Sequence, residues 1–246
     1  KNPIVFCTEN FKRNLPLKLF FVLFFPICLL AKEPVYFIHG FLRKASSMEK
    51  MAQAFQKQEY ETHLWDYPSR SQTIEEHSEV LVEELQKYSD SHKGEPIHFV
   101  THSLGGIILR GALNHPNCPS EAKRGRIVLL SPPNQGSSFA RFLNRFKLIR
   151  KVFGSKSGTQ LLTTQTFEYL GQFPETSTVL IISGSFGWNP VINEKNDGKV
   201  GVSETLLSTP HKQITLLCGH SWMMRSNRVI QESLDFIRNK QDSARG

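Results

Sequence analysis

The sequence predicts an α/β fold in which a mostly parallel sheet of about six strands carries helices on both faces. Short apolar, β-branched runs alternate along the chain with amphipathic helical segments, which is typical of a parallel sheet buried on both sides. The 246 residues are 39% hydrophobic and include 18 Phe, enough for one domain with a substantial core. In such a fold the functional site is expected among the loops at the carboxyl ends of the strands.

Six strands and four main helices are expected in alternation. The strands are residues 34–42, 62–68, 97–102, 125–132, 178–184 and 213–219, and the helices are residues 47–58, 72–88, 107–113 and 222–238. Each strand is a run of apolar or β-branched residues that stops near a Pro or Gly. The helix over 72–88 has one apolar stripe and one face of Glu side chains, which we expect to lie in solvent.

Residues 137–177, between the fourth and fifth strands, are expected to form a small cap. Their aromatic and aliphatic side chains recur at helical spacing and alternate with cations. The favoured interpretation is a surface helix that packs its apolar stripe inward. The alternative is a mobile cap over the site, or a helix that meets lipid, because aromatic residues beside cations suit a membrane surface.

Residues 1–31 resemble a leader that precedes the folded domain, residues 32–246. A basic stretch at residues 12–18 is followed by an uncharged apolar run at residues 19–31 that contains Pro26. This run is short for a membrane-spanning helix but suits the apolar region of a signal peptide. We therefore expect a signal peptide or membrane anchor, and an exported or membrane-associated protein. If the leader is not a signal, the expected location is the cytoplasm.

Charge and cysteine usage narrow the classes of partner. The formal net charge is +8, of which residues 1–31 carry +3 and the remainder carries +5. No nucleic-acid motif accompanies this modest excess, so an anionic membrane surface is the expected partner and nucleic acid is not. Beyond residue 31 only Cys118 and Cys218 remain, and their spacing predicts no metal site. An exported protein could pair them in a disulfide.

The strand over 97–102 leads directly into Ser103 and then into a helix that opens with two glycines. A strand, a sharp turn with a serine at its tip and a helix are what a nucleophile elbow requires. Residues 102–105 match the Gly-x-Ser-x-Gly pattern, but Thr101 stands where the first glycine is usual. The same segment is also compatible with a simple turn in which Ser103 caps the helix, so the rest of the chain must decide.

An activated serine needs a base, and His220 is the best-placed of nine histidines. It follows the sixth strand, at the same edge as Ser103. His102 is adjacent in sequence, but neighbouring strand residues point to opposite faces, so it should not reach the serine. His211 precedes the sixth strand, at the wrong edge. His39 is expected to shape the loop after the first strand.

The base in turn needs an acid to orient it. The loop after the fifth strand offers Asp197 in an Asn-Asp-Gly turn, which can present a carboxylate, and Glu194 as the second candidate. Asp197 is preferred, and the same residues could also be only a turn. For the developing oxyanion, the expected donors are the backbone N–H of Leu104 and, from the loop after the first strand, the backbone N–H of Phe41.

Taken together, these segments resemble a lipase or esterase of the α/β-hydrolase family. The matching pieces are residues 39–41, 102–106, 132–137, 196–198 with Val200 and Ser203, and 219–221. They stand in the family's order of nucleophile, acid and base and cover most of residues 33–238. The resemblance implies an α/β-hydrolase fold, a Ser103–His220–Asp197 triad and no cofactor. Thr101 and the compact cap depart from the pattern and leave the subgroup open.

The expected function is hydrolysis of carboxylic esters through an acyl-enzyme. The many aromatic residues and the basic, apolar cap favour lipid or other acyl esters as substrates. An acyl thioesterase or an acyltransferase would use the same triad, and these alternatives remain open. A membrane-binding module without catalytic activity is the alternative from a different class.

Overall fold

The structure is a computed structural model that describes residues 32–239. The predicted leader, residues 1–31, lies outside this part of the chain, so its role stays a prediction. Within the described range, none of the helices combines the length and the apolar character needed to cross a bilayer.

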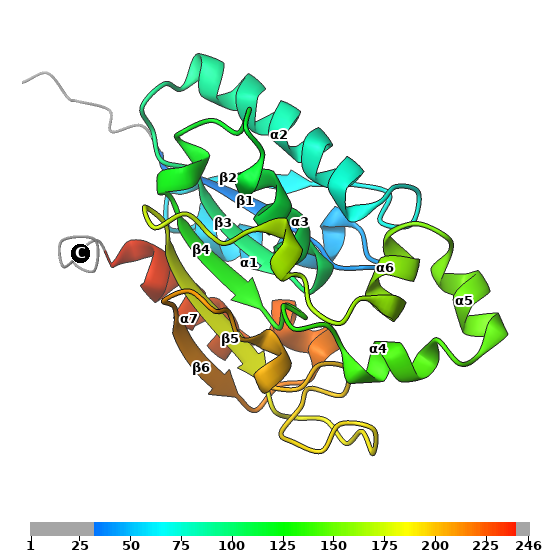
Figure 1. The fold of residues 1–246 in the computed structure, drawn as a ribbon. Coiled ribbons are helices and arrows are strands. Elements are labelled where there is room, and N and C mark those ends of the chain that lie inside the picture. Colours follow the sequence, from blue (N-terminus) through cyan, green and yellow to red (C-terminus); the bar gives the residue numbers. More distant parts are fainter. Residues whose placement is uncertain (1–31, 240–246) are drawn as a thin grey trace, which may run out of the picture. The chain divides into compact units, whose positions relative to one another are not determined.

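One sheet of six parallel strands forms the centre of the fold (Figure 1), as the alternating pattern predicted. The strands are β1 (Pro34–Ile38), β2 (Glu61–Trp65), β3 (His98–His102), β4 (Arg126–Leu130), β5 (Thr178–Gly184) and β6 (Lys212–Leu216), in the order β2-β1-β3-β4-β5-β6. Thr101 of β3 pairs with Ile38 on one side and Leu129 on the other. The loops that follow β1, β3, β5 and β6 therefore open at one edge.

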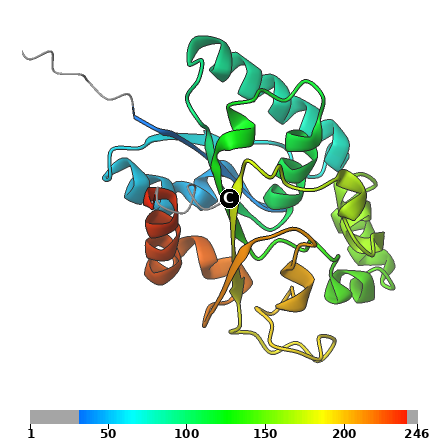
Figure 2. The ribbon, with the colours of Figure 1, turned by 60° about the vertical axis from the view of Figure 1, so that its left-hand side comes forward.

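Helices cover both faces of the sheet. Figure 2 shows α1 (Glu49–Gln56) and α7 (Asn227–Arg238) on one side, and α2 (Ile74–Ser91) and α3 (Leu104–Asn114) on the other. Strand side chains alternate between them: Tyr36 and Ile38 pack on the α2–α3 side, whereas Val35 and Phe37 pack on the α1–α7 side. Burial of each such side chain contributes about 1.5–3 kcal/mol, so both layers hold the sheet edge in place.

Several element ends differ from the sequence prediction. The predicted helix over 222–238 starts later, because residues His220–Arg225 form the 3₁₀ helix η5 and Ser226 then caps α7 at the backbone N–H of Val229. β1 and β6 stop before the predicted glycines. The remaining 3₁₀ helices are η1 (Ala45–Met48), η2 (Ala122–Arg124), η3 (Glu168–Leu170) and η4 (Ser203–Thr205).

The cap consists of three short helices, α4 (Ser138–Leu143), α5 (Lys147–Phe153) and α6 (Ser157–Thr163). The favoured prediction, one helix with its apolar stripe packed inward, is therefore wrong. Phe146 has an extended backbone that separates α4 from α5, and Gly154 ends α5 at φ +82°. No residue of α4 or α5 is buried, and Leu148 is 72% exposed.

Both cysteines of the described chain are buried free thiols. Cys118 packs in the cluster on the α2–α3 side of the sheet and Cys218 in the cluster on the α1–α7 side. The disulfide that the sequence would allow is therefore not formed, because the sheet separates the two residues.

Candidate active site

Ser103 sits at the turn between β3 and α3 with a left-handed backbone, φ 52° and ψ −119°. A non-glycine residue in such a conformation costs about 1–3 kcal/mol, and this strain is common where a side chain must be presented for function. The turn is possible because strand and helix approach closely: a Cβ on Gly105 would lie 2.6 Å from the carbonyl oxygen of Ile38. The elbow geometry predicted from the motif is thus present.

Thr101, the departure from the usual motif, is accommodated by a second glycine. Its hydroxyl lies only 3.1 Å from the position that a Cβ on Gly106 would occupy. Thr101 is fully buried, and its Oγ1 has no hydrogen-bond partner in the described part of the chain. The missing side chain at Gly106 leaves the room that the motif's first glycine leaves in other elbows.

Asp197 and His220 form a buried pair. Nδ1 of His220 lies 2.7 Å from Oδ2 of Asp197, and the backbone N–H of His220 donates to the Asp197 carbonyl at 2.9 Å. The other carboxylate oxygen, Oδ1, accepts from the backbone N–H groups of Lys199 and Val200 at 2.9 and 2.8 Å. The turn around Asp197 therefore aims one carboxylate oxygen at the imidazole and anchors the other.

The pKa of Asp197 is lowered from its usual value. Burial alone would raise it, but the charge of His220 and hydrogen bonds from His220, Ser131 and Val200 outweigh that effect. The carboxylate is therefore ionised at neutral pH and suited to stabilise an imidazolium. Ser131 was missed in the sequence, although its position directly after β4 was a usable signal. Its own left-handed backbone, φ 42°, accompanies this role.

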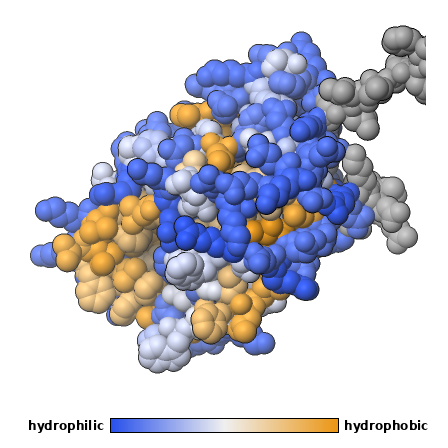
Figure 3. Space-filling view, turned by 180° about the vertical axis from the view of Figure 1, so that it is seen from behind, coloured by the Kyte–Doolittle hydropathy of each residue, from blue (hydrophilic) through white to orange (hydrophobic). Residues whose placement is uncertain are grey.

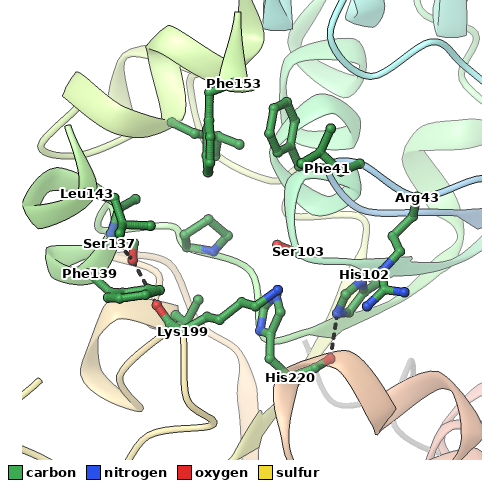
Figure 4. A pocket seen from close by; sticks show the side chains of 15 residues that line it. Phe41, Arg43, His102, Ser103, Ser137, Phe139, Leu143, Phe153, Lys199 and His220 are labelled. Carbon is green, nitrogen blue, oxygen red and sulfur yellow. Dashed lines mark hydrogen bonds between the residues drawn. The ribbon is translucent and has the colours of Figure 1, made fainter. Parts of the chain in front are cut away.

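Ser103 and His220 line one cavity of about 360 Å³ at the carboxyl edge of the sheet (Figure 4). Within residues 32–239 no hydrogen bond joins the Ser103 hydroxyl to His220 or to any other group. Such bonds are often long in a site without substrate and tighten when it binds. The structure thus brings Ser103, His220 and Asp197 to one site, with the Asp197–His220 bond already formed.

His102 has no hydrogen bond to Ser103 in the described residues, but its ring lines the same cavity, with its centroid 4.7 Å from that of His220. Its Nε2 donates to the backbone carbonyl of His220 at 3.0 Å, a bond drawn in Figure 4. Burial holds the pKa of His102 well below its usual value, and the nearby charges of His220, Arg43 and Lys199 lower it further. The ring is therefore a neutral donor that fixes the loop carrying His220.

The two backbone N–H groups predicted as oxyanion donors make no hydrogen bond within the described residues. Among residues 32–239 no group accepts a hydrogen bond from the backbone N–H of Phe41 or of Leu104. Leu104 opens α3, where the first N–H groups have no partner inside the helix. His39 shapes the neighbouring loop, because its Nδ1 donates to the Gly40 carbonyl at 2.9 Å.

Glu194, the second candidate for the acid, does not reach His220. Its carboxylate accepts hydrogen bonds from the backbone N–H and the hydroxyl of Ser203, at 3.1 and 2.5 Å. It therefore braces the loop that carries Asp197. His211 precedes β6, and its Nδ1 is bonded to the Thr209 carbonyl.

The cap covers the apolar side of the cavity. Phe139, Leu143 and Phe153 of the cap line it, and the rings of Phe41 and Phe153 lie 4.9 Å apart. At its start the cap is fastened to the acid loop, because the Ser137 hydroxyl donates to the Lys199 carbonyl at 2.8 Å. The alternative prediction was a mobile cap over the site or a helix that meets lipid: the structure places cap side chains at the cavity, and the mobility and the lipid contact stay predictions.

Comparisons with known proteins agree with this fold. Residues 35–190 match the model of the alpha/beta hydrolase family, a range that includes Phe41 and Ser103 and ends before Asp197. A search of curated proteins finds no match. Among solved structures, the mature lipase BlEst2 of Bacillus licheniformis is similar with a TM-score of 0.71 and 19% identity, over 85% of this chain and 93% of that chain.

Two further structures have the same fold. The metagenomic carboxyl esterase MGS0156 aligns with a TM-score of 0.62 and 16% identity, over 78% of this chain and 65% of its own. Phospholipase PlaB from Legionella pneumophila aligns with a TM-score of 0.60 and 15% identity, over 86% and 61%. Since the family model covers more than half of the sequence, the chain belongs to the alpha/beta hydrolase family.

Proposed function

We propose that this protein is a serine hydrolase that cleaves carboxylic esters, with acyl lipids as the favoured substrates. The observation that carries the proposal is the convergence of a strained Ser103 elbow and a buried Asp197–His220 pair on one apolar cavity. A turn without catalytic function would need neither the strain nor the buried ion pair.

In the proposed reaction, the Ser103 hydroxyl attacks the ester carbonyl while His220 takes its proton. Since Asp197 occupies Nδ1 of His220, Nε2 is the nitrogen left for that proton. The backbone N–H groups of Phe41 and Leu104 hold the oxyanion. His220 then protonates the leaving alcohol, and water, activated by the same imidazole, releases the acid from Ser103.

The apolar lining of the cavity suits an acyl chain. Its lining is largely aromatic and aliphatic, with Phe41, Phe139 and Phe153 on the cap side. Similar solved structures are named as a lipase, a carboxyl esterase and a phospholipase, which agrees with an ester substrate. An apolar pocket of this kind favours longer chains, because each buried methylene adds about 0.8 kcal/mol.

The test is covalent labelling combined with an ester panel. A fluorophosphonate probe should label the wild-type protein at Ser103 and leave Ser103→Ala unlabelled, and only the wild type should hydrolyse p-nitrophenyl esters of two to twelve carbons. Matching thioesters and an added alcohol acceptor separate esterase from thioesterase and acyltransferase activity. Absence of both labelling and hydrolysis in a folded wild-type protein would refute the proposal.

We also propose that the cap meets an anionic lipid surface. Figure 3 shows apolar residues gathered on the side of the molecule where α4 and α5 lie. Phe146, Leu148 and Val152 are 48%, 72% and 44% exposed there, and Lys147 and Lys151 are exposed among them. Apolar side chains for the acyl region and cations for the headgroups suit such a surface.

Vesicle sedimentation tests this second proposal. The protein should bind phosphatidylglycerol vesicles more strongly than phosphatidylcholine vesicles, and Leu148→Glu should weaken that binding. Val80→Glu introduces the same charge at a 40% exposed position of α2 and should bind like the wild type. Equal binding by all three proteins, or no binding, would contradict the assignment of the cap.

A further inference from the structure

The cavity has a charged side that the proposed chemistry does not use. Arg43 and Lys199 line it together with Ser103 and His220. In Figure 4 the Lys199 side chain extends across the cavity toward His220, and the Arg43 guanidinium extends from the opposite wall toward His102. Phe153 of the cap lies beside Phe41 and away from the two cations, whereas Phe139 lies next to Lys199. The cavity thus has an apolar part around Phe41 and Phe153 and a part into which both cations reach.

Both cations are held in place by the backbone that builds the site. The backbone N–H of Lys199 donates to Asp197 at 2.9 Å, and its carbonyl accepts from Ser137 at 2.8 Å. The backbone N–H of Arg43 closes a turn on the Gly40 carbonyl at 3.2 Å, two residues after Phe41. Each side chain therefore starts from a fixed point next to a group that handles the ester.

Neither cation is neutralised by the protein. In the part of the chain that the structure describes, no carboxylate forms an ion pair with Arg43 or Lys199, although ion pairs occur elsewhere on the surface. Desolvation lowers the pKa of Lys199, and repulsion from Arg43 lowers it further, while Asp197 raises it. Both side chains are exposed to solvent, which screens their mutual repulsion, and neither is tied up by a side-chain ion pair in the described residues, so both are available to an anion that enters the cavity.

We propose that Arg43 and Lys199 bind an anionic oxygen group, a phosphate or a carboxylate, on the alcohol part of the substrate. The alcohol side follows from the position of His220, which would protonate the leaving oxygen: Lys199 extends toward it, and Arg43 extends toward the neighbouring His102. The acyl chain then occupies the part around Phe41 and Phe153. The preferred substrate is an acyl ester of a small anionic alcohol, an inference that rests on the proposed ester hydrolase function.

The reaction on such a substrate balances without any further reagent. Ser103 Oγ bonds to the acyl carbon, the ester C–O bond breaks, and the departing alkoxide takes the proton held by His220. The anionic alcohol leaves, and water cleaves the acyl-enzyme to the free acid. Throughout, the bound anion offsets the repulsion between the two cations and the imidazolium on His220.

Three butanoyl esters with the same acyl group test the inference: butanoyl glycerol, butanoyl glycerol phosphate and the butanoyl ester of glyceric acid. The kcat/KM of the wild type should be roughly tenfold or more higher for an anionic ester than for butanoyl glycerol, because hydrogen bonds between charged groups are stronger than those between neutral groups. Whether phosphate or carboxylate gives the larger preference identifies the group. Arg43→Gln and Lys199→Gln should each reduce the preference by roughly tenfold.

Lys93→Gln is the matched control, because it removes one exposed charge from the loop between α2 and β3. It should keep the wild-type preference. If a cavity variant fails to fold by circular dichroism, the wild-type protein still decides, because its preference should fall as sodium chloride rises from 20 to 500 mM. A wild-type preference that is absent or independent of salt overturns the inference and leaves the ester hydrolase proposal standing. Loss of fluorophosphonate labelling together with all ester hydrolysis overturns both.

Discussion

The carboxyl edge of the sheet and the cap that faces it are built in opposite ways. At the edge, Thr101, Leu104 and Asp197 are buried, and each loop is bonded to the next: His102 to the His220 loop, and His220 to Asp197. In the cap, α4 and α5 bury no residue. The loops at the edge are thus packed together with the core. In the cap only α6 is anchored, through buried Leu161 and Leu162, whereas α4 and α5 lie at the surface.

We therefore expect the sheet edge to carry out the reaction and the cap to select the ester that binds. Groups that must meet within hydrogen-bond distance come from rigid loops at strand ends, where a shift of one strand would be resisted by the whole sheet. The cap side chains proposed to contact the acyl chain come largely from α4 and α5, where small changes of shape should cost little stability. Substitutions at the edge should therefore abolish turnover or unfold the protein, and substitutions in the cap should change only which esters bind.

The largest effect is expected at Asp197. Asp197→Asn should lower kcat/KM by roughly 10³–10⁴-fold, because the amide neither stabilises the imidazolium nor fixes its tautomer. Ester hydrolysis by the purified variants measures it. Glu194→Gln makes the same change at the other candidate acid, which contacts Ser203, and should stay close to the wild type. If Glu194→Gln shows the larger loss, the acid is misassigned.

A methyl group at the elbow should be the next most damaging change. In Gly105→Ala the new Cβ would lie 2.6 and 2.7 Å from the carbonyl oxygens of Ile38 and His39, which belong to the end of β1. We expect a loss of about 1–3 kcal/mol in unfolding free energy and a large loss of activity, because the oxyanion loop must move. Urea denaturation and ester hydrolysis give the two quantities.

Gly94→Ala is the matched control for Gly105→Ala. Gly94 has φ +87° but no atom within 4 Å of the added Cβ. Only the backbone penalty of about 1–2 kcal/mol applies there, so activity should not change. If both variants lost activity to a similar extent, crowding at the elbow would not be the cause of the activity loss in Gly105→Ala.

Acid should destabilise the sheet layers more than the cap, which contains no histidine in residues 137–177. His77 of α2 is buried, and burial chiefly lowers its pKa to about 4. A histidine with a lowered folded pKa binds protons better when unfolded, so its stabilisation is complete above about pH 6.5 and falls as the pH approaches 4. The expected loss for His77 between pH 7.5 and pH 4.5 is up to about 2 kcal/mol.

His77→Leu isolates this effect, since leucine packs without a titrating group. Urea denaturation at both pH values should show a smaller acid-induced loss in His77→Leu than in the wild type. His39 and His102 also have lowered pKa values and remain in both proteins, so the comparison cancels them. An equal loss in the two proteins would mean that His77 is not the group that senses acid.

The edge was also the part of the molecule that the sequence predicted well. Apolar runs identified all six strands, and because parallel strands share one carboxyl edge, Ser103, Asp197 and His220 could be assigned to one site without coordinates. Asp197 and Glu194 remained competing candidates, because both stand in the same loop. Only the backbone bonds from Lys199 and Val200 show which carboxylate is turned inward.

The cap and the charged side of the cavity could not be read from the sequence. The helical spacing of apolar residues continues across Asn144 and Arg145. Nothing in the local sequence indicates that Phe146 adopts an extended backbone, which separates α4 from α5. No sequence pattern singles out Arg43 and Lys199, since they are distant in sequence and line the same cavity only once the fold brings their two loops together. Ser131 stands directly after β4, which places it at the correct edge, but its hydrogen bond to Asp197 is a tertiary contact that only the structure shows.

The smallest effect is expected in the cap, where Phe153 of α5 contacts Phe41 across the cavity with ring centroids 4.9 Å apart. Phe153 also lines the cavity, so Phe153→Ala removes apolar surface that would cover a long acyl chain; with about 0.8 kcal/mol lost for each methylene left uncovered, KM for a dodecanoyl ester should rise roughly two- to tenfold. Hydrolysis of an acetyl ester should change much less, because its acyl group is too short to reach the ring.

Phe142→Ala is the control, because the Phe142 ring belongs to the same cap but does not line the cavity. It should leave the ratio of the two rates unchanged. If Phe153→Ala instead lowered kcat equally on both esters, the cap would be holding the oxyanion loop in place, and the separation between a chemical edge and a selective cap would fail at this contact.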